Sequence, residues 1–330
     1  MTKFSLVLEG DKPLEYYTRY LALAEKYDMT SFQIYEHLTF RPAWSIIFHI
    51  AKFVRKILIG PVTVPVMLCH PLYTAANIAT LSELTGGNAI LGLSRGTFYE
   101  YLSQEVEKPI RAVKEAVEII DLLFRGGGGY HGEIFSVSNS AQLKLPRFHR
   151  PRMYVGSSGP KMIQMASGLA PVSGIVIDNL WNSKSVKRIR ENIRIGASKA
   201  GKKPDELEVI ARPFCCVMQD GDEARRTVAK ELIHYLPSLV ANSPMLSEAG
   251  LDLKQIQEFL ADPGGQDEVL TTLIENFSAA GTPEEIVEQT DRILSEGVTH
   301  VCYGHPLGRD IEESIRLLGE RVKPYFQGER

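Results

Sequence analysis

Short apolar runs rich in β-branched residues alternate along the chain with longer stretches whose apolar residues recur at helical spacing. The short runs predict buried strands at 3–8, 31–35, 57–64, 88–94, 152–156, 173–177, 206–218 and 298–303. The longer stretches predict helices at 14–27, 42–55, 71–84, 109–124, 160–169, 183–200 and 310–322. This alternation predicts an α/β fold, a single closed (β/α)₈ TIM barrel over residues 1–330 rather than an open sheet.

Two segments interrupt the alternation and predict insertions on the barrel. The first, at about 126–140, begins with the run Gly126–Gly129 and continues into Tyr130–Val137, whose alternation predicts a small hairpin. The second, at about 221–282, is mostly helical in pattern and lies between the seventh and eighth predicted strands.

Composition and charge narrow the class of protein. At 330 residues and 44% hydrophobic, the chain can bury a large core, and its formal net charge of −3 comes from interspersed acids and bases. This balance argues against nucleic-acid binding, which usually needs a basic face. No apolar run approaches the ~18 residues of a membrane span, and the N-terminus lacks a cleavable signal pattern. Four cysteines without a CxxC unit favour reduced thiols, so we expect a soluble cytoplasmic protein.

Candidate functional residues follow from the rule that barrel active sites lie at the C-terminal ends of the strands. A glutamate placed there can have a raised pKa and exchange protons near neutral pH, and a histidine can contact a bound heterocycle. Each one alone is more often an ordinary surface residue, but their convergence on one face favours a site. The residues at these ends are Glu9, Glu36, His37, Thr63, His70, Ser94, Asp178, Arg212 and His305.

A strand–loop–helix segment supplies the most informative pattern. Gly156, Ser157, Ser158 and Gly159 are small residues between a predicted strand and a helix that opens at Pro160 and Lys161. Unpaired N–H groups and the helix dipole make such a place a phosphate site. A tight turn with a serine cap explains the local pattern about equally well.

Other chemistries find less support. The scattered histidines form no HExxH motif and no ligand cluster, which disfavours a metal site. There is neither a dinucleotide fingerprint opening a helix nor a GxSxG elbow. In the third strand, Pro61 within the run Gly60–Thr63 predicts a bulge or similar irregularity, because proline cannot donate to a sheet.

Several segments, in order and spacing, resemble one family of barrel proteins. They are 24–28 (AEKYD), Glu36-His37, His70-Pro71, 84–92 (LTGGNAILG), 112–120, 154–161, 281–285 (GTPEE) and 304–310 (GHPLGRD). The chain resembles the bacterial-luciferase-like superfamily, and within it the branch that uses the deazaflavin coenzyme F420. The final Gly-x-Pro-Leu-Gly stretch is similar to that of the methylenetetrahydromethanopterin reductases.

The resemblance implies a reaction and a set of roles. Hydride would pass between the deazaflavin C5 and a small-molecule substrate, a one-carbon pterin such as a tetrahydropterin. Glu9 would be the proton donor or charge partner, and His37 would lie against the ring. A non-prolyl cis peptide would fall near Pro61 and Val62. The implied cofactor-binding residues are Glu36, Pro61, Val62, Thr63 and Ser94, with Gly156, Ser157, Ser158, Gly159, Pro160 and Lys161 at the phosphate.

The chain departs from the family pattern in ways that keep alternatives open. Glu36-His37 replaces the usual Asp-His, Val172-Ser173-Gly174 replaces Ala-Asp-Gly, and 64–69 (VPVMLC) is apolar. One alternative is an FMN-dependent monooxygenase of the luciferase type. Another is a non-catalytic flavin-binding barrel or a subunit for an active partner. Apolar stretches at 44–48 and 75–79 are compatible with a homodimer or homotetramer, although a core-facing stripe explains them nearly as well.

Overall fold

A computed structural model describes residues 2–97, 99–102, 106–240, 244–262 and 267–328. Its centre is one parallel sheet in the order β3-β2-β1-β13-β10-β9-β8-β5-β4, and a bridge between Ile59 and Ala89 joins the two ends. The strands are β1 (Lys3–Leu8), β2 (Ser31–Ile34), β3 (Leu58–Pro61), β4 (Val64–Pro65), β5 (Ile90–Ser94), β8 (Arg152–Gly156), β9 (Val172–Asp178), β10 (Glu208–Arg212) and β13 (His300–Tyr303). Because β3 and β4 share one strand position, the predicted eight-stranded barrel is confirmed.

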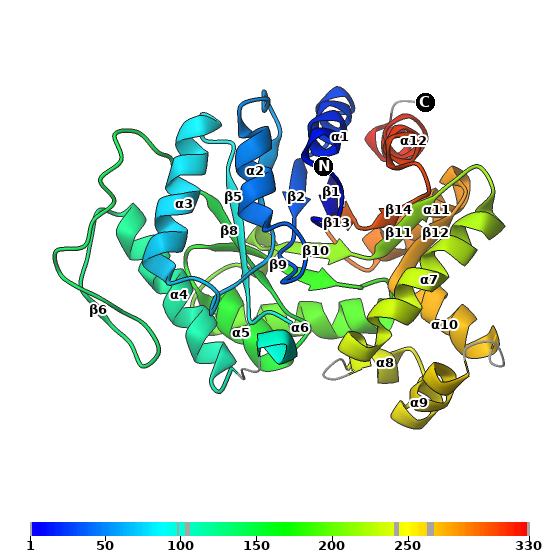
Figure 1. The fold of residues 1–330 in the computed structure, drawn as a ribbon. Coiled ribbons are helices and arrows are strands. Elements are labelled where there is room, and N and C mark those ends of the chain that lie inside the picture. The colour runs from blue at the N-terminus through cyan, green and yellow to red at the C-terminus, as the bar shows by residue number, and fades with distance from the viewer. Residues whose placement is uncertain (1, 98, 103–105, 241–243, 263–266, 329–330) are drawn as a thin grey trace.

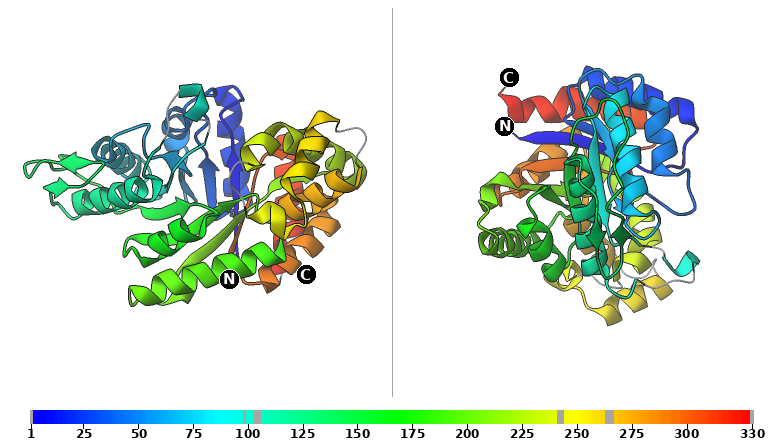
Figure 2. Two further views of the ribbon diagram at one scale, coloured as in Figure 1. Left: turned by 90° about the horizontal axis from the view of Figure 1, so that it is seen from below. Right: turned by 90° about the vertical axis from the view of Figure 1, so that its left-hand side faces the viewer.

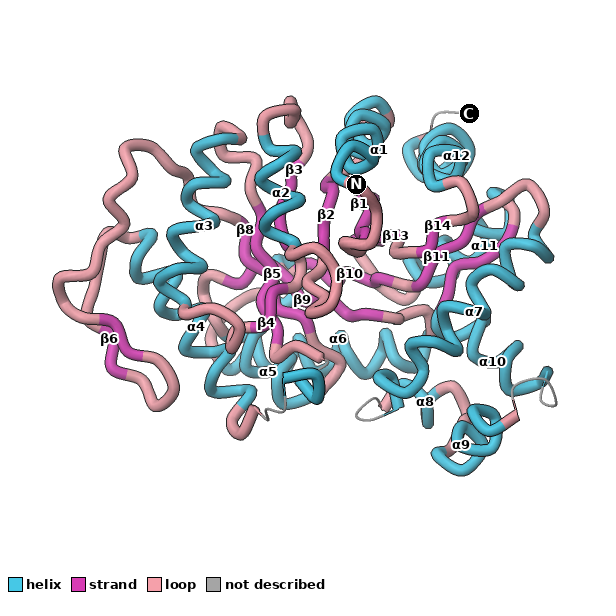
Figure 3. Tube along the Cα trace, in the orientation of Figure 1, coloured by secondary structure: helices cyan, strands magenta, loops and turns pink. Residues whose placement is uncertain are grey.

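Eight helices surround the barrel and pack side by side. Their arrangement is drawn in Figures 1 and 3. They are α1 (Leu14–Lys26), α2 (Ala43–Ala51), α3 (Pro71–Leu84), α4 (Pro109–Phe124), α5 (Pro160–Gly168), α6 (Ser183–Lys199), α11 (Pro283–Ser295) and α12 (Ile311–Leu317). The chain also contains the short helical turns η1 (Tyr99–Leu102), η2 (Pro204–Glu206), η4 (Leu318–Val322) and η5 (Lys323–Gln327). The helices bury their apolar faces against the strands, which forms the main core. None of the described helices is long and apolar enough to cross a membrane.

The barrel interior is packed with side chains. Its middle is apolar and is formed by a separate cluster, Val7, Val62, Ile90, Tyr154, Val176, Ile210 and Cys302. One residue from each strand position except β2 contributes to this cluster, as expected for alternating inward-facing positions. The packed middle separates the two ends of the barrel.

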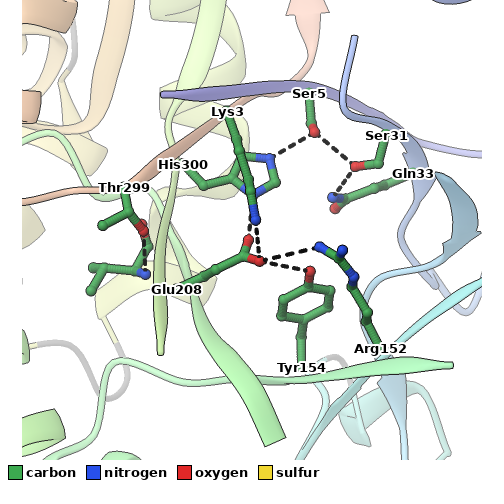
Figure 4. A network of polar contacts seen from close by, with 10 residues as sticks. Lys3, Ser5, Ser31, Gln33, Arg152, Tyr154, Glu208, Thr299 and His300 are labelled. Atoms are coloured by element: carbon green, nitrogen blue, oxygen red, sulfur yellow. Dashed lines mark hydrogen bonds and ion pairs between the residues drawn. The ribbon is translucent and has the colours of Figure 1, made fainter. Parts of the chain in front are cut away.

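A polar network occupies the N-terminal end of the barrel (Figure 4). Glu208 lies at its centre, with Lys3 Nζ at 2.6 Å and His300 Nδ1 at 3.0 Å from its carboxylate oxygens. The other nitrogen of His300 lies 2.7 Å from the hydroxyl of Ser5, which accepts a hydrogen bond from Ser31. Buried polar groups are stable only when they are paired, so this network stabilises the barrel end.

The predicted strand 206–218 is wrong as a single element. It divides at Pro213 into β10 and β11 (Phe214–Val217), because proline has no N–H for a ladder. Strand β11 leaves the barrel and pairs in parallel with β12 (Ser278–Gly281) and β14 (Pro306–Leu307) in a small second sheet. The pattern analysis missed β12, since Ser-Ala-Ala-Gly lacks the β-branched and aromatic residues that mark strands.

The segments between the regular units lie at opposite ends of the molecule (Figures 1 and 2). The hairpin predicted in the first segment is present as β6 (Tyr130–His131) and β7 (Ser136–Val137). The second segment contains α7 (Gly221–Val240), α8 (Met245–Glu248), α9 (Leu253–Ala261) and α10 (Asp267–Phe277). Its positions 241–243 and 263–266 lie outside the described residues. A capping box of Thr282 and Glu285 begins α11, the helix that belongs to the seventh strand.

Candidate active site

A cluster around Glu9 forms at the C-terminal end of the barrel, next to the end of β1. The hydroxyls of Tyr35 and Tyr235 both donate to the same carboxylate oxygen, Oε2, at 2.6 and 2.8 Å. His305, which follows β13, lies with its Nδ1 3.4 Å from the Tyr35 hydroxyl. Its ring also contacts Phe214 and Tyr235 edge-on. The cluster therefore joins β1, β2, α7 and the segment after β13.

The electrostatics of Glu9 differ from the expected raised pKa. Burial raises the pKa of Glu9, but the charge of His305 and the hydrogen bonds from Tyr35 and Tyr235 lower it more, so the net pKa is below the ordinary value. Burial raises the pKa of both tyrosines, which keeps their hydroxyls protonated. Glu9 is therefore a carboxylate at neutral pH.

The neighbouring residues Glu36 and His37 have pKa values shifted in opposite directions. Glu36 Oε2 accepts a hydrogen bond from the Ala43 N–H at the start of α2, at 3.1 Å. Burial nevertheless raises the pKa of Glu36 to about 7. His37 is buried and stacks on Phe40 with ring centroids 4.2 Å apart. Burial lowers the pKa of His37, so the ring is mostly neutral at pH 7.

The third strand position is irregular where Pro61 predicted it. A non-prolyl cis peptide joins Val62 and Thr63, one bond beyond the expected place. The buried guanidinium of Arg212 donates to the carbonyl oxygen of Val62 and also binds Asp178. Gly92 leaves room for this segment, since a Cβ there would lie 2.6 Å from Val62 Cγ1.

The loop before α5 faces the same end of the barrel. A Cβ on Gly156 would lie 2.7 Å from Thr63 Cγ2 and 3.5 Å from Ser94 Cβ, so these three residues lie close together. No side chain caps the N-terminus of α5, where Gly159 is the N-cap and Pro160 the first helical residue. The N–H groups of this helix start are thus free of side-chain caps, as an anion site requires.

Two further contacts brace this loop. The Gly159 N–H donates to Ser157 Oγ at 3.0 Å. Arg188 of α6 donates to the Ser158 carbonyl at 2.9 Å and pairs with Glu248 of α8 at 2.6 Å. The loop is therefore connected through one guanidinium to the helices of the second insertion segment.

An open cleft of about 570 Å³ adjoins the Glu9 cluster. It is formed by the segments that follow β1 and β2 and is lined by Gly10, Asp11, Thr39, Phe40, Arg41 and Pro42. Over the described residues, no group of three or more His, Cys, Asp or Glu side chains could hold a metal ion. The chemistry available here is that of a carboxylate, phenols, imidazoles and a helix N-terminus.

The structure brings most of the sequence-predicted residues to one face, but it adds partners that local patterns could not supply. Thr63, Ser94 and Gly156 meet, and Glu9 lies near His37 closely enough for their charges to interact. Tyr235 was not predicted, because it lies on α7, 226 residues from Glu9. Arg212, Asp178 and His305 were marked only as strand ends, without a role. Pro160 and Lys161 are exposed.

Comparisons with known proteins identify similar sequences and similar structures. The family model of luciferase-like monooxygenases matches residues 2–300. A 5,10-methylenetetrahydromethanopterin reductase of Archaeoglobus fulgidus is 35% identical over 325 residues, which covers 94% of this chain and 95% of that protein. The solved structure of a coenzyme F420-dependent tetrahydromethanopterin reductase from Methanopyrus kandleri has a TM-score of 0.87 at 26% identity, covering 98% of this chain and 99% of that one. An F420-dependent secondary alcohol dehydrogenase shares the fold, with a TM-score of 0.81 at 19% identity and coverage of 98% of both chains.

Proposed function

Because this chain belongs to the luciferase-like monooxygenase family, we propose that it is an F420-dependent oxidoreductase that transfers hydride between the deazaflavin C5 and a one-carbon tetrahydropterin. The observation that carries the proposal is the match to a methylenetetrahydromethanopterin reductase over nearly the full length of both chains. The Glu9 cluster, the Val62–Thr63 irregularity and the loop at Gly156 support it, since they lie at one end of the barrel.

The donor set fits a coenzyme that bears a phosphate. The uncapped start of α5 offers backbone N–H groups, and Lys161 adds a positive charge. Because Gly156 has no side chain, its backbone lies close to Thr63 and Ser94, where a Cβ would clash. We therefore assign Gly156, Ser157, Ser158 and Gly159 with the start of α5 to the phosphate, and Pro61, Val62, Thr63 and Ser94 to the ring system.

The chain's own residues supply positioning and charge. When bound, the deazaflavin contributes a hydride donor or acceptor at C5. The packed apolar middle of the barrel forms a dry floor beneath this site. The neutral ring of His37 and the carboxyl group of Glu36 lie at the mouth, and the carboxylate of Glu9 faces the substrate side. Holding two carbons face to face in this way accounts for most of the catalysis.

The first experiment is a titration of the purified apo-protein with F420 and, in parallel, with FMN. Tight binding of F420 and weak binding of FMN is the expected result. Reduced F420 and methylenetetrahydromethanopterin should then give turnover, which is measured through the change in deazaflavin absorbance. Preference for FMN, together with oxygen consumption by the reduced flavin, would instead support an FMN-dependent monooxygenase activity. Binding of neither cofactor would favour the non-catalytic barrel, and lack of turnover with any pterin would refute the substrate assignment.

We further propose that the enzyme works in the cytoplasm as a homodimer or homotetramer. The exposed aromatic residues Phe53, just after α2, and Tyr73, on α3, support an interface on these helices. Light scattering of the purified protein, compared with a Tyr73→Glu variant, tests this: the wild type should be oligomeric and the variant should be smaller. A monomeric wild type would refute the interface.

A further inference from the structure

The arrangement of hydrogen bonds around Glu9 is asymmetric. Tyr35 and Tyr235 reach it from β2 and α7, and both hydroxyls donate to Oε2. The other carboxylate oxygen accepts no side-chain hydrogen bond from the described residues. A carboxylate that accepts two phenol protons on one oxygen is held in place without being neutralised.

The charged and titratable groups that face Glu9 come from several elements. His305 follows β13, His37 follows β2, and the two tyrosines complete the surroundings. Tyr17 of α1 donates to the backbone carbonyl of Glu9 at 2.5 Å, which holds the backbone of Glu9 in place. No lysine or arginine pairs with this carboxylate among the described residues.

The direction of the hydrogen bonds determines where protons lie. The hydroxyl proton of Tyr35 goes to Glu9, so the Tyr35 oxygen can only accept from His305. The Nε2 of His305 is buried without a hydrogen-bond partner in the described structure. Tyr35 thus links His305 to Glu9, and Tyr235 donates a second hydrogen bond to Glu9 Oε2.

We propose that Tyr35, Tyr235 and His305 are positioning residues that keep Glu9 as an anion, so that it serves as the counter-charge for a substrate whose reacting carbon becomes cationic. This inference rests on the proposed function and concerns the charge that develops on the one-carbon unit of its substrate, a cyclic aminal. The lowered pKa of Glu9 agrees with this role, since a group ionised at neutral pH has no proton to donate.

The chemistry of a 5,10-methylene bridge fits an anion at this place. The bond between the bridging carbon and N10 breaks, its electron pair stays on N10, and the carbon remains joined to N5 as an iminium cation. Hydride from the reduced coenzyme forms the new C–H bond. One proton from solvent ends on N10, and one proton from the coenzyme returns to solvent. The carboxylate stabilises the positive charge as it develops.

An alcohol substrate makes the opposite demand. Its oxidation needs a base that removes the hydroxyl proton, and two phenol donors on Glu9 weaken it as a base. We therefore expect a strong preference for one-carbon aminals over secondary alcohols. Glu9→Gln should lower kcat/KM for the aminal by roughly 10²–10³-fold without weakening F420 binding.

The test that needs no cofactor is a carbon-13 NMR titration of the full chain labelled at the glutamate carboxyl carbon, with Glu9 assigned from the Glu9→Gln variant. The midpoint in the wild type should lie below the ordinary value for glutamate. It should rise in Tyr35→Phe, in Tyr235→Phe and in His305→Gln, and rise most in the double tyrosine variant. Tyr303→Phe is the matched control, because it removes a buried tyrosine hydroxyl that bonds Thr290 instead of Glu9; its Glu9 midpoint should not change.

A wild-type midpoint at or above the ordinary value, or a midpoint unaffected by the three replacements, would overturn the inference. In turnover assays the acidic limb of the kcat/KM profile should move to higher pH in the same variants. A profile that does not move would also count against it. An enzyme that turns over no pterin refutes the proposed function and the substrate class, while the carboxyl titration still decides whether these residues fix the charge of Glu9.

Discussion

Replacing Glu208 with glutamine should destabilise the barrel in a strongly pH-dependent way. Glu208 lies at the N-terminal end of the barrel, far from the candidate active site, and its side chain is only 14% exposed. Its carboxylate binds Lys3 and His300, and Arg152 lies 3.6 Å away. The variant keeps the shape of the side chain but removes the charge on which these contacts depend.

The magnitude follows from the pKa of Glu208. Burial raises this pKa, but the hydrogen bonds and charges of His300 and Lys3 lower it more, to about 2, from an ordinary value of 4.5. Each pH unit of that difference corresponds to ~1.4 kcal/mol, so the ionised group stabilises the folded state by about 3 kcal/mol at neutral pH. Because the folded pKa is depressed, this stability is complete above pH 4.5 and is lost as the pH falls toward 2. About 1 kcal/mol of it should remain at pH 3.

Thermal unfolding followed by circular dichroism between pH 3 and pH 7 measures this effect. For a chain of this length, a loss of about 3 kcal/mol corresponds to a Tm lower by roughly 4 °C. The Tm difference between wild type and Glu208→Gln should shrink as the pH falls. Glu206→Gln is the matched control, because Glu206 is 65% exposed and forms an ion pair with Lys203 on the surface. A difference that is equal at pH 3 and pH 7, or no larger than that of the control, would refute the reasoning.

Three further outcomes are expected. Glu115 accepts the N–H groups of residues 133, 134 and 135, so Glu115→Gln should speed hydrogen exchange of the β6–β7 hairpin, and exchange at the wild-type rate would contradict this. Burial raises the pKa of Glu36 to about 7, so the stability that its neutral form contributes is lost as the pH rises from 4.5 through 7. Glu36→Gln should flatten this part of a Tm–pH series, and a persisting fall would assign it to another group. Gly156→Ala places a Cβ 2.7 Å from Thr63 Cγ2 and should weaken F420 binding by about tenfold or more. Fluorescence titration, with Tm as the check on folding, would show a wild-type affinity if the loop does not contact the coenzyme.

The sequence by itself determined the features that depend on local pattern. Alternating apolar runs and helical stretches specify the barrel, because strand and helix periodicities differ. The small residues from Gly156 to Gly159 before Pro160 mark the start of a helix, whereas the choice between a serine cap and an uncapped start was made by the structure, which has no side-chain cap there. Proline in the third strand marks the irregularity at Val62, although the pattern alone placed it only to within a bond or two.

Only the tertiary structure decided the electrostatics of the site. Whether a glutamate holds or loses its proton depends on groups that reach it through space, and Tyr235 reaches Glu9 from 226 positions away. The expected raised pKa therefore belongs to Glu36, which is buried and has no cationic partner among the described residues. Around Glu9, two phenol donors and the charge of His305 lower the pKa instead. The departure of β11 from the barrel depended likewise on a partner, β12, whose small residues give no strand pattern of their own. These contacts join residues that are distant in the sequence, so local periodicity cannot predict them.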